Sequence, residues 1–305
     1  MQSIITILGT TAIGKSKLSI ELAKKFDGII ISADSRQIYK GFDIGSGKIT
    51  ADEMQGIEHY MLDIKELWQD YNLSEFKTDA TAILSDLKQQ NTLPFIVGGT
   101  GLYIEAIIYD YQIPNIPPQA ELRHNLSQET KEILQKILLE IKPAHNLNQS
   151  DWHNPVRLIR AIETANINQS DQIKQNNSLY NSLIIGLKST LENIKSRITK
   201  RVDDRLTQGA IEEVQKIQRI LGEHLSPEMA SKKICQFGLG TNFILDYLNH
   251  KIDYKTMREK YIQAEYQYAR RQLTWFRRMK DIVWFEADDK DLIDKTSLLI
   301  ADFLK

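Results

Sequence analysis

The residues with the clearest chemistry lie at positions 9–16, which read GTTAIGKS. Their spacing satisfies G-x-x-x-x-G-K-[ST], a pattern typical of glycine-rich loops that cradle phosphate groups. Glycines let backbone N–H groups turn inward, Lys15 adds a full positive charge, and the Ser16 hydroxyl can ligate Mg²⁺. We therefore expect a diphosphate or triphosphate ligand, whether or not a phosphoryl group is transferred. The candidate binding residues are Gly9, Thr10, Thr11, Ala12, Ile13, Gly14, Lys15 and Ser16.

A second candidate, Asp34, lies just beyond the apolar run at 28–32. Open parallel sheets bind their ligands at the carboxyl ends of the strands, so this carboxylate is expected beside the phosphate loop. Three roles fit that position: holding Mg²⁺ through water, acting as general base, or capping the next helix. The sequence alone leaves the choice open.

A third candidate turn follows the apolar run at 94–98 and contains Gly98, Gly99, Thr100 and Gly101. Glycines there allow a ligand to approach the backbone closely, and Thr100 offers a hydroxyl at the same sheet edge. Turns of this composition are common between strands and helices, so this motif alone is a weak signal.

Residues 255–280 form a basic, aromatic segment with helical spacing. The segment holds eight Lys or Arg residues and two Glu residues, a net charge of +6. Arginines at 270, 271, 277 and 278 repeat at a spacing of seven, which predicts one face of a helix. Interleaved Tyr and Trp side chains favour RNA, whose phosphates pair with arginine and whose unpaired bases stack on aromatic rings. The alternative is a solvated charged face backed by core aromatics.

Composition excludes several other classes of protein. The chain has 305 residues, 42% of them hydrophobic and 26% charged, and a formal net charge of -1. Its one cysteine, Cys235, cannot form an internal disulfide, and zinc-finger spacing is absent, so we expect a cytoplasmic protein without structural metal. No apolar run is long enough to cross a bilayer, which predicts no membrane association.

The elements that must position these residues alternate between strand-like and helical patterns. Apolar, β-branched runs predict strands at 4–8, 28–32, 94–98, 182–187 and 282–286, separated by amphipathic helical segments. This order indicates an α/β fold with a P-loop NTPase-like parallel sheet. We expect a discontinuous core of residues 1–110 and 182–305, with a long helical excursion over 190–280. Residues 111–181 are expected to form a helical insertion domain of two helical stretches, with a loop at 166–177.

Taken together, the motifs resemble the bacterial tRNA dimethylallyltransferases, also called tRNA isopentenyltransferases. The resemblance extends almost from end to end and rests on GTTAIGKS, ISADSRQIYKGFDIGSGK, FIVGGTGLYIEAI, VRLIRAIE, RVDDRLTQGAIEEV and YARRQLTWFRR, in family order. It implies a cytoplasmic, monomeric prenyltransferase that binds dimethylallyl diphosphate on its P-loop. The acceptor would be N6 of the adenosine just 3′ of the anticodon, within the anticodon stem-loop of tRNA.

The resemblance also implies roles for individual residues. Thr11, Lys15 and Ser16 would hold the diphosphate together with Mg²⁺, with Ser16 as the metal ligand. Asp34 would be the general base, Thr100 would contact the target nucleotide, and Arg201 would assist the departing diphosphate. Further positions match tRNA contacts in the family: Asp34, Ser35, Arg36, Gln37, Arg123, Val156, Arg157, Leu158, Ile159, Arg160, Arg270, Arg271, Arg277 and Arg278.

Two stretches depart from the family pattern. Thr10 and Ile13 stand where proline and serine are usual, and GLGT at 238–241 replaces a Gly-Tyr-Lys-Glu stretch. The second change removes an aromatic ring and a cation near 238–241, where the resemblance implies contacts to tRNA.

Two other functions are compatible with part of the pattern. A P-loop small-molecule kinase would use ATP in the loop and Asp34 to activate a substrate hydroxyl. A non-catalytic RNA-binding protein would use the loop as a nucleotide switch. The kinase leaves 255–280 without a role, and the switch leaves Asp34, Thr100 and Arg201 without one.

Overall fold

The computed structural model describes the whole chain except residues 112, 114–115, 144–146 and 166–178. The loop expected at 166–177 therefore lies outside the described residues. The chain divides into two compact units: unit 1 comprises Met1–Ile108 and Ser178–Lys305, and unit 2 comprises Tyr109–Asn177. The expected limits, 110/111 and 181/182, differ from these by a few residues.

Unit 1 contains a six-stranded sheet whose strand order is β3-β2-β4-β1-β5-β6. Every neighbouring pair is parallel, which confirms the predicted α/β fold. Ile7 of β1 lies opposite Val97 of β4 and Ile185 of β5. Strands covered on both faces are mainly apolar, as are the buried stretches of β1, β2, β4 and β5. The bounds are β1 Gln2–Gly9, β2 Gly28–Ser32, β3 His59–Tyr60, β4 Leu93–Gly98, β5 Tyr180–Lys188 and β6 Ile282–Glu286.

Strand β3 is absent from the sequence prediction. It contains only His59 and Tyr60 and extends the sheet by pairing with β2. Two residues on a sheet edge are too few to produce a hydrophobic repeat, so the hydrophobic pattern gives no signal for it.

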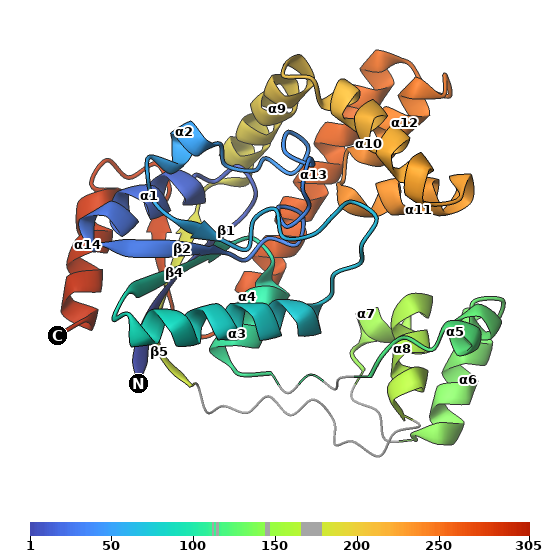
Figure 1. Cartoon of the computed structure of the whole chain (residues 1–305), viewed down its shortest axis with the longest axis horizontal. Coiled ribbons are helices and arrows are strands. Elements are labelled where there is room, and N and C mark those ends of the chain that lie inside the picture. Colours follow the sequence, from blue (N-terminus) through green and yellow to red (C-terminus); the bar gives the residue numbers. More distant parts are fainter. Residues whose placement is uncertain (112, 114–115, 144–146, 166–178) are drawn as a thin grey trace. The chain divides into compact units, whose positions relative to one another are not determined.

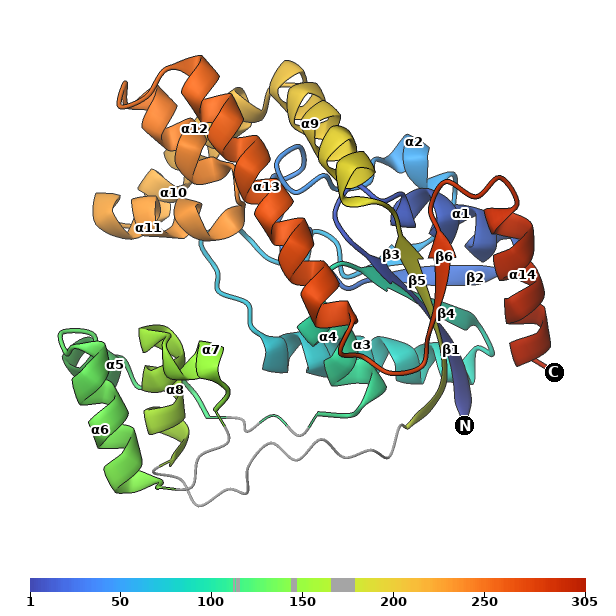
Figure 2. The ribbon, with the colours of Figure 1, turned by 180° about the vertical axis from the view of Figure 1, so that it is seen from behind.

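Helices cover both faces of the sheet (Figures 1 and 2). On one face, α1 (Lys15–Lys25) packs beside α14 (Leu292–Phe303), and on the other α3 (Leu73–Gln89) packs beside α4 (Gly101–Ile108). The short α2 (Ala51–Met54) is capped by Thr50. Helix α3 begins with a capping box between Asn72 and Glu75, which satisfies N–H groups of its first turn. Ile7, Leu22 and Phe95 are fully buried between these layers.

Five helices lie between β5 and β6. Their bounds are α9 Leu191–Thr207, α10 Ala210–His224, α11 Pro227–Phe237, α12 Thr241–Leu248 and α13 Tyr254–Phe276. Helix α13 packs along α9 and reaches α4 and β1, so it connects this helical region with the sheet (Figure 2).

The basic segment is helical only to Phe276, so the prediction that all four arginines share a helix is wrong for Arg277 and Arg278. Arg277 is the C-cap of α13, and the N–H groups of Arg278 and Met279 turn back to carbonyls in its last turn. Asp281 then adopts a left-handed φ of 62°, which redirects the backbone into β6. The spacing of the arginines continues past the end of α13. Because the spacing of charged residues does not indicate where a helix ends, the sequence pattern did not predict this end.

In unit 2 the described residues contain four helices where the sequence predicted two helical stretches. They are α5 Ala120–Leu126, α6 Lys131–Ile141, α7 Gln149–Trp152 and α8 Pro155–Ala165. Leu134 and Leu138 of α6 pack with Leu158 and Ile162 of α8 in a separate small core. Helix α7 is a single turn capped by Asn148 and gives no hydrophobic repeat of its own.

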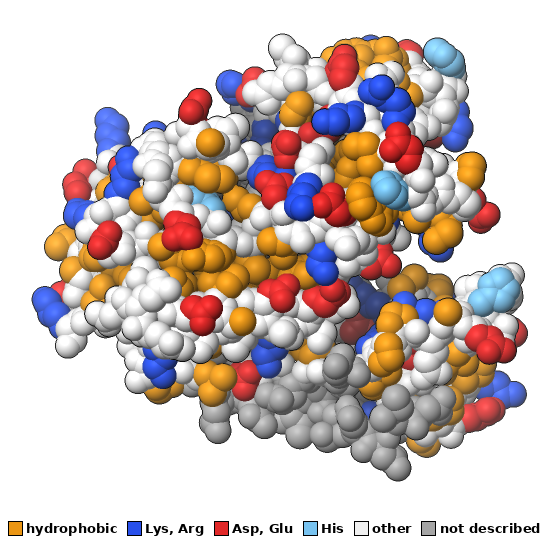
Figure 3. Space-filling view, viewed as in Figure 1, with side chains coloured by type: hydrophobic (Ala, Val, Ile, Leu, Met, Phe, Trp, Pro, Cys, Tyr) orange, Lys and Arg blue, Asp and Glu red, His pale blue; other side chains and the backbone are white. Residues whose placement is uncertain are grey.

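No single sign of charge dominates the face seen in Figure 3. Acidic and basic side chains lie side by side on the face seen in Figure 3, in keeping with the net charge of -1. Over the described part of the chain, no helix combines the length and apolar character needed to cross a membrane.

Candidate active site

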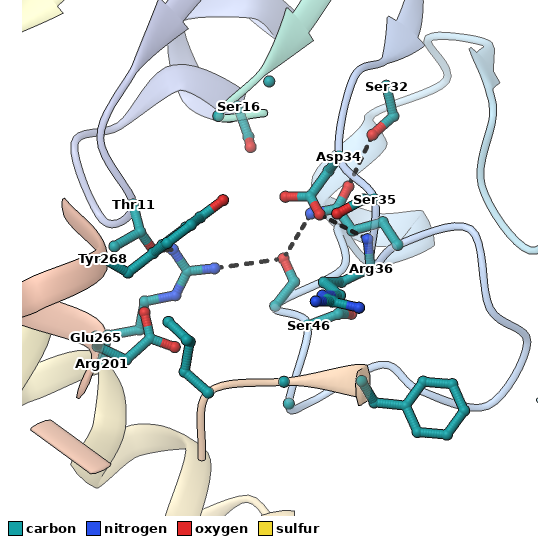
Figure 4. Close-up of a pocket in the computed structure, with 18 of the residues that line it drawn as sticks. Thr11, Ser16, Ser32, Asp34, Ser35, Arg36, Ser46, Arg201, Glu265 and Tyr268 are labelled. Carbon is teal, nitrogen blue, oxygen red and sulfur yellow. Dashed lines mark hydrogen bonds between the residues drawn. The ribbon is translucent and has the colours of Figure 1, made fainter. Parts of the chain in front are cut away.

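A cavity of about 520 Å³ opens in unit 1 at the carboxyl ends of β1, β2 and β4 (Figure 4). This is the edge at which open parallel sheets bind ligands. Segments distant in sequence meet there: the phosphate loop, the turn after β2, the loop 45–47, and the helices α9 and α13. The residues used below that line it are Thr11, Lys15, Ser16, Asp34, Ser35, Arg36, Gln37, Gly47, Gly99, Arg201, Arg205, Glu265, Tyr268 and Gln272.

The phosphate loop connects β1 to the first residue of α1, Lys15. Gly14 precedes the helix with φ 102°, a conformation that favours glycine. Lys15 Nζ donates to the carbonyls of Gly9 at 3.1 Å and Thr10 at 2.7 Å. Burial, together with the positive charge of Arg201, lowers the pKa of Lys15 to about 8. The Ser16 hydroxyl points into the cavity (Figure 4).

The two departures in the loop fall away from this cavity. Thr10 and Ile13 are buried, with exposed fractions of 0% and 2%. Ala12, Ile13 and Gly14 line a second cavity of about 700 Å³ beside the loop, which shares Lys15 and other residues with the first. Proline or serine is therefore not needed at these positions to form the cavity wall that faces Asp34.

Asp34 follows β2 and points into the cavity (Figure 4). Its Oδ1 accepts a hydrogen bond from the backbone N–H of Arg36 at 2.9 Å, an interaction within a turn. The helix-cap interpretation is wrong, because the next helix begins only at Ala51 and is capped by Thr50. Within the described part of the chain, Asp34 Oδ2 accepts no hydrogen bond, so one oxygen is available to a ligand.

Arg201 enters the cavity from α9, across from Asp34 (Figure 4). Its Nη1 donates to Thr11 Oγ1 at 3.4 Å and its Nη2 to the Gly47 carbonyl at 3.5 Å, both long contacts. Burial and the neighbouring Arg205 lower its pKa to about 10. No salt bridge to Arg201 occurs among the described residues. The guanidinium is therefore a partly desolvated cation without a carboxylate partner.

The neighbouring Arg205 forms a salt bridge with Glu265, which compensates its positive charge. Its Nη1 donates to Glu265 Oε1 at 3.0 Å and to Tyr261 Oη at 3.2 Å, and the Arg205 and Glu265 side chains are 6% and 10% exposed. This buried pair joins α9 to α13 and leaves Arg201 as the cation directed at the cavity from α9.

Thr100 lies one residue beyond the cavity lining. Its Oγ1 accepts a hydrogen bond from the Ser35 N–H at 3.4 Å, and its side chain is hydrogen-bonded to Tyr268. Burial and the nearby charge of Asp34 raise the pKa of Tyr268 to about 12, so the phenol is protonated at neutral pH. Thr100 thus supports the turn that carries Ser35 and the Tyr268 ring.

Gln37 fixes the opposite wall. Its Oε1 accepts from Ser32 Oγ at 3.0 Å, and its Nε2 donates to the Gly47 carbonyl at 3.3 Å. Arg36, between Ser35 and Gln37, is exposed. Of the four expected tRNA contacts at 34–37, Arg36 is therefore the charged group directed to the surface of this turn.

Gln272 is a site residue that the sequence reasoning missed. Its Oε1 accepts from the Thr11 N–H at 2.8 Å, and its Nε2 donates to the Gly99 carbonyl at 2.9 Å. The side chain is 6% exposed and ties the phosphate loop to the turn after β4. A signal does exist: Glu265 and Gln272 occupy positions with the helical spacing of the buried residues Tyr261, Ala269 and Phe276.

The remaining expected RNA contacts of unit 1 lie on its surface. Arg270 and Arg271 are exposed on α13, and Arg277 and Arg278 are exposed just after it. Arg271 lies 5.7 Å from the Tyr268 ring and Arg278 lies 5.3 Å from the Trp275 ring. In the departing stretch 238–241, Leu239 lines the cavity, and the Thr241 hydroxyl is buried against the carbonyls of Ile234 and Gly238.

In unit 2 the arginines are paired with acids. Arg123 Nε and Nη2 each donate to Glu163 at 2.7 Å, and Arg160 Nη1 donates to the same carboxylate at 3.1 Å. Arg157 pairs with Asp151. The remaining expected tRNA contacts differ in exposure: Val156 is 76% exposed and Ile159 is half-buried, but Leu158 is fully buried. The expectation of an RNA contact through the Leu158 side chain is therefore wrong, because it packs inside the unit-2 core.

Comparisons with known proteins identify the family of the chain. Residues 37–279 match the family model of IPP transferase. The chain is 34% identical to the tRNA dimethylallyltransferase of Anoxybacillus flavithermus, covering 96% of this chain and 93% of the relative, and 36% identical to that of Geobacillus thermodenitrificans, covering 95% and 92%.

Solved structures give the same result. The full-length tRNA isopentenylpyrophosphate transferase of Bacillus halodurans matches with a TM-score of 0.73 and 32% identity, covering 100% of this chain and 97% of that one. A eukaryotic dimethylallyltransferase acting on tRNA matches in fold, with a TM-score of 0.78 and 24% identity over 99% of this chain and 78% of that one. This chain therefore belongs to the IPP transferase family of tRNA dimethylallyltransferases.

Proposed function

We propose that this enzyme transfers the dimethylallyl group of dimethylallyl diphosphate to N6 of the adenosine 3′ of the anticodon in tRNA, giving N6-isopentenyladenosine and diphosphate. One observation carries the proposal: a phosphate loop with two desolvated cations, Lys15 and Arg201, faces an available carboxylate, Asp34, across one cavity. Cations suit the leaving diphosphate, and the carboxylate suits the proton that the adenine amine must lose.

The donor end is supported by Thr11, Lys15, Ser16 and Arg201. Among the described residues, Lys15 donates only to backbone carbonyls and Arg201 makes only long contacts. Both cations can therefore turn to a diphosphate without breaking a salt bridge to a described residue. Negative charge grows on the diphosphate as its bond to C1 breaks. Cations that are desolvated and already in place stabilise that charge more strongly than water does.

The residues also fit Mg²⁺ bound together with the diphosphate. No cluster of three or more His, Cys, Asp or Glu in the described chain could hold a metal by protein ligands alone. The Ser16 hydroxyl points into the cavity, and Mg²⁺ commonly takes one or two protein oxygens, with phosphate oxygens and water completing the set. Ser16 would hold the ion, which supplies positive charge to the leaving group.

The acceptor end is supported by Asp34. The adenine N6 lone pair is delocalised into the ring, so the amine is a weak nucleophile. As N6 forms its bond to C1, the C1–O bond breaks, its electron pair leaves with the diphosphate, and Asp34 takes the N6 proton. The fixed Asp34 Oδ1 contact to Arg36 orients the carboxylate, and its Oδ2 remains available.

Binding of tRNA is supported by cations on both units. Arg36, Arg270 and Arg271 are exposed in unit 1. In unit 2, the half-buried Arg123 and Arg160 are held by Glu163. Drawing the target base out of the anticodon loop costs a few kcal/mol, which backbone and stacking contacts must offset. We propose that the enzyme acts as a cytoplasmic monomer, and that Thr100 contacts the target nucleotide.

Label transfer tests this function against the kinase and switch alternatives. The enzyme is incubated with Mg²⁺, unmodified tRNA, and either dimethylallyl diphosphate labelled in the prenyl group or γ-labelled ATP. We expect prenyl label in tRNA at the adenosine 3′ of the anticodon and none from ATP. Label moving from ATP to a small molecule would instead establish a kinase, and no transfer from either donor would remove the enzyme assignment.

A further inference from the structure

Glu213 of α10 makes an unusual contact with a distant loop. Its Oε1 accepts hydrogen bonds from the N–H groups of Asp43 and Ile44, both at 2.7 Å, and its Oε2 accepts one from Gly45 at 2.8 Å. Three consecutive backbone amides thus surround one carboxylate from 168 to 170 residues away in sequence. Charge-assisted bonds of this kind are short and strong, so they fix the loop firmly to α10.

The same loop forms part of the wall of the reaction cavity. Gly45, Ser46 and Gly47 line it, and the Gly47 carbonyl accepts from both Arg201 and Gln37. Gly47 has φ 62°, and a Cβ atom added there would lie 1.9 Å from Arg201 Nη2. The backbone of this loop therefore lies directly against the guanidinium of Arg201.

A second anchor, Lys48, holds the loop besides Glu213. Lys48 Nζ donates to the Tyr39 carbonyl at 2.7 Å and forms salt bridges with Asp43 and Asp63. Removing Glu213 would leave this anchor in place and release mainly the amides of residues 43–45. The expected consequence is a change in the path of the backbone up to Gly47, and not unfolding of the whole segment.

We propose that Glu213 is a positioning residue for prenyl transfer, which sets Arg201 against the donor diphosphate by holding the loop 43–47. The inference rests on the proposed function. Because the Glu213 carboxylate is satisfied by three amides, it fixes the loop without taking up the positive charge of Arg201. The diphosphate then meets an arginine that is held in place and still unpaired.

Glu213→Gln tests this role, because the amide keeps the size of the side chain but turns one acceptor into a donor facing an N–H group. We expect kcat/KM for dimethylallyl diphosphate to fall ~10-fold or more, with tRNA affinity within twofold of wild type. Glu212→Gln is the matched control: it removes the same charge from the adjacent, exposed position and should leave both values unchanged.

A double-mutant cycle with Arg201→Ala separates positioning from a general structural role. If Glu213 acts through Arg201, adding Glu213→Gln to Arg201→Ala should reduce kcat/KM by less than twofold further. Fully additive losses, or a lower melting temperature with unchanged donor kinetics, would overturn the proposal. Should the amide variant fail to fold, Glu213→Asp keeps the charge and should show the same donor-specific loss in smaller measure. A wild-type enzyme without prenyl transfer would instead refute the proposed function itself.

Discussion

Arginine has different surroundings in the two units. In unit 1, Arg201 lies in a cavity without a salt bridge among the described residues, and burial lowers its pKa to about 10. In unit 2, Arg123 is bonded to Glu163, whose side chain is 0% exposed, and that hydrogen bond raises the pKa of Arg123.

The two arrangements suit two different tasks of a cation: stabilising charge that develops during a reaction, and binding a polyanion. A cation that has to stabilise developing charge is most effective when it is desolvated and unpaired before the ligand arrives. A cation that has to hold a flexible polyanion benefits more from a fixed direction, which a buried carboxylate provides. The Glu163 carboxylate accepts hydrogen bonds from both Arg123 and Arg160. The three side chains together therefore keep a net positive charge.

The largest predicted effect concerns the chemical step in unit 1. Asp34→Asn should keep the hydrogen bond from the Arg36 N–H but cannot accept the proton of N6, so single-turnover prenyl transfer should slow by ~10² to 10⁴. Binding of dimethylallyl diphosphate should change little. A variant that transferred the prenyl group at nearly the wild-type rate would remove Asp34 from the mechanism. Partial recovery at high Mg²⁺ would assign it to the metal.

The next prediction uses the pKa of Lys15, which burial lowers to about 8. Above that pH the free enzyme loses the Lys15 charge, so kcat/KM for the donor should fall about tenfold per pH unit. The fall should begin well below the pKa of Arg201, about 10. Lys15→Arg should move the decline to higher pH. A profile that stayed flat from pH 7.5 to 9.5 would show that Lys15 does not hold the diphosphate in its charged form.

A smaller effect is expected in unit 2. Glu163→Gln should release Arg123 and Arg160 from their fixed directions and weaken tRNA binding ~10-fold, with donor affinity unchanged. Glu121→Gln, at an exposed position of α5, is the matched control and should bind tRNA normally. Fluorescence titration with an anticodon stem-loop measures the change. Equal affinities for the two variants would contradict the role assigned to this group.

The same variant has a pH signature. Burial alone would raise the pKa of Glu163, but hydrogen bonds from Arg123, the Gln119 N–H and Arg160 outweigh it and lower the pKa to about 2. The depressed pKa means that the stabilisation is complete above the ordinary value of 4.5 and is lost as pH falls toward about 2. The difference in melting temperature between wild type and Glu163→Gln should therefore be full at pH 7 and close over that range.

The smallest effects are expected at the exposed arginines on and after α13. Replacing Arg270, Arg271, Arg277 or Arg278 singly with alanine should reduce the slope of log affinity against log salt by ~0.7 to 0.9 wherever a phosphate contact is lost. Arg219→Ala, exposed on α10, provides the control. If all four variants kept the wild-type slope and affinity, this segment would not bind tRNA.

Local patterns predicted the elements and the phosphate loop because each depends on neighbouring residues. The five predicted strands are mainly apolar runs. The loop pattern places Gly14 where a left-handed φ is needed. The two errors have the same cause. Strand β3 and the end of α13 each involve only a few residues, which are too few to change the hydrophobic or charge repeat.

The supporting residues could not be predicted in this way. Gln272 contacts Thr11 across 261 residues, Glu213 contacts Gly45 across 168, and Glu163 contacts Arg123 across 40. Each is a polar side chain whose partner is chosen by the packing of the whole unit. Their residue types fit a solvated helix face equally well, so only the fold distinguishes a buried acceptor from an exposed one.

β1 lies between β4 and β5, and those two partners leave the ribosome at very different times. Residues 93–98 provide the first neighbour early, but the second begins only at Tyr180, and β6 follows at Ile282. Until about three fifths of the chain has been made, β1, the strand leading into the phosphate loop, has one edge with unpaired backbone N–H and C=O groups. Exposed edges of this kind invite pairing with other chains. We expect nascent chains that stop before residue 188 to aggregate or to bind chaperones, and full-length chains to escape both once β5 has paired.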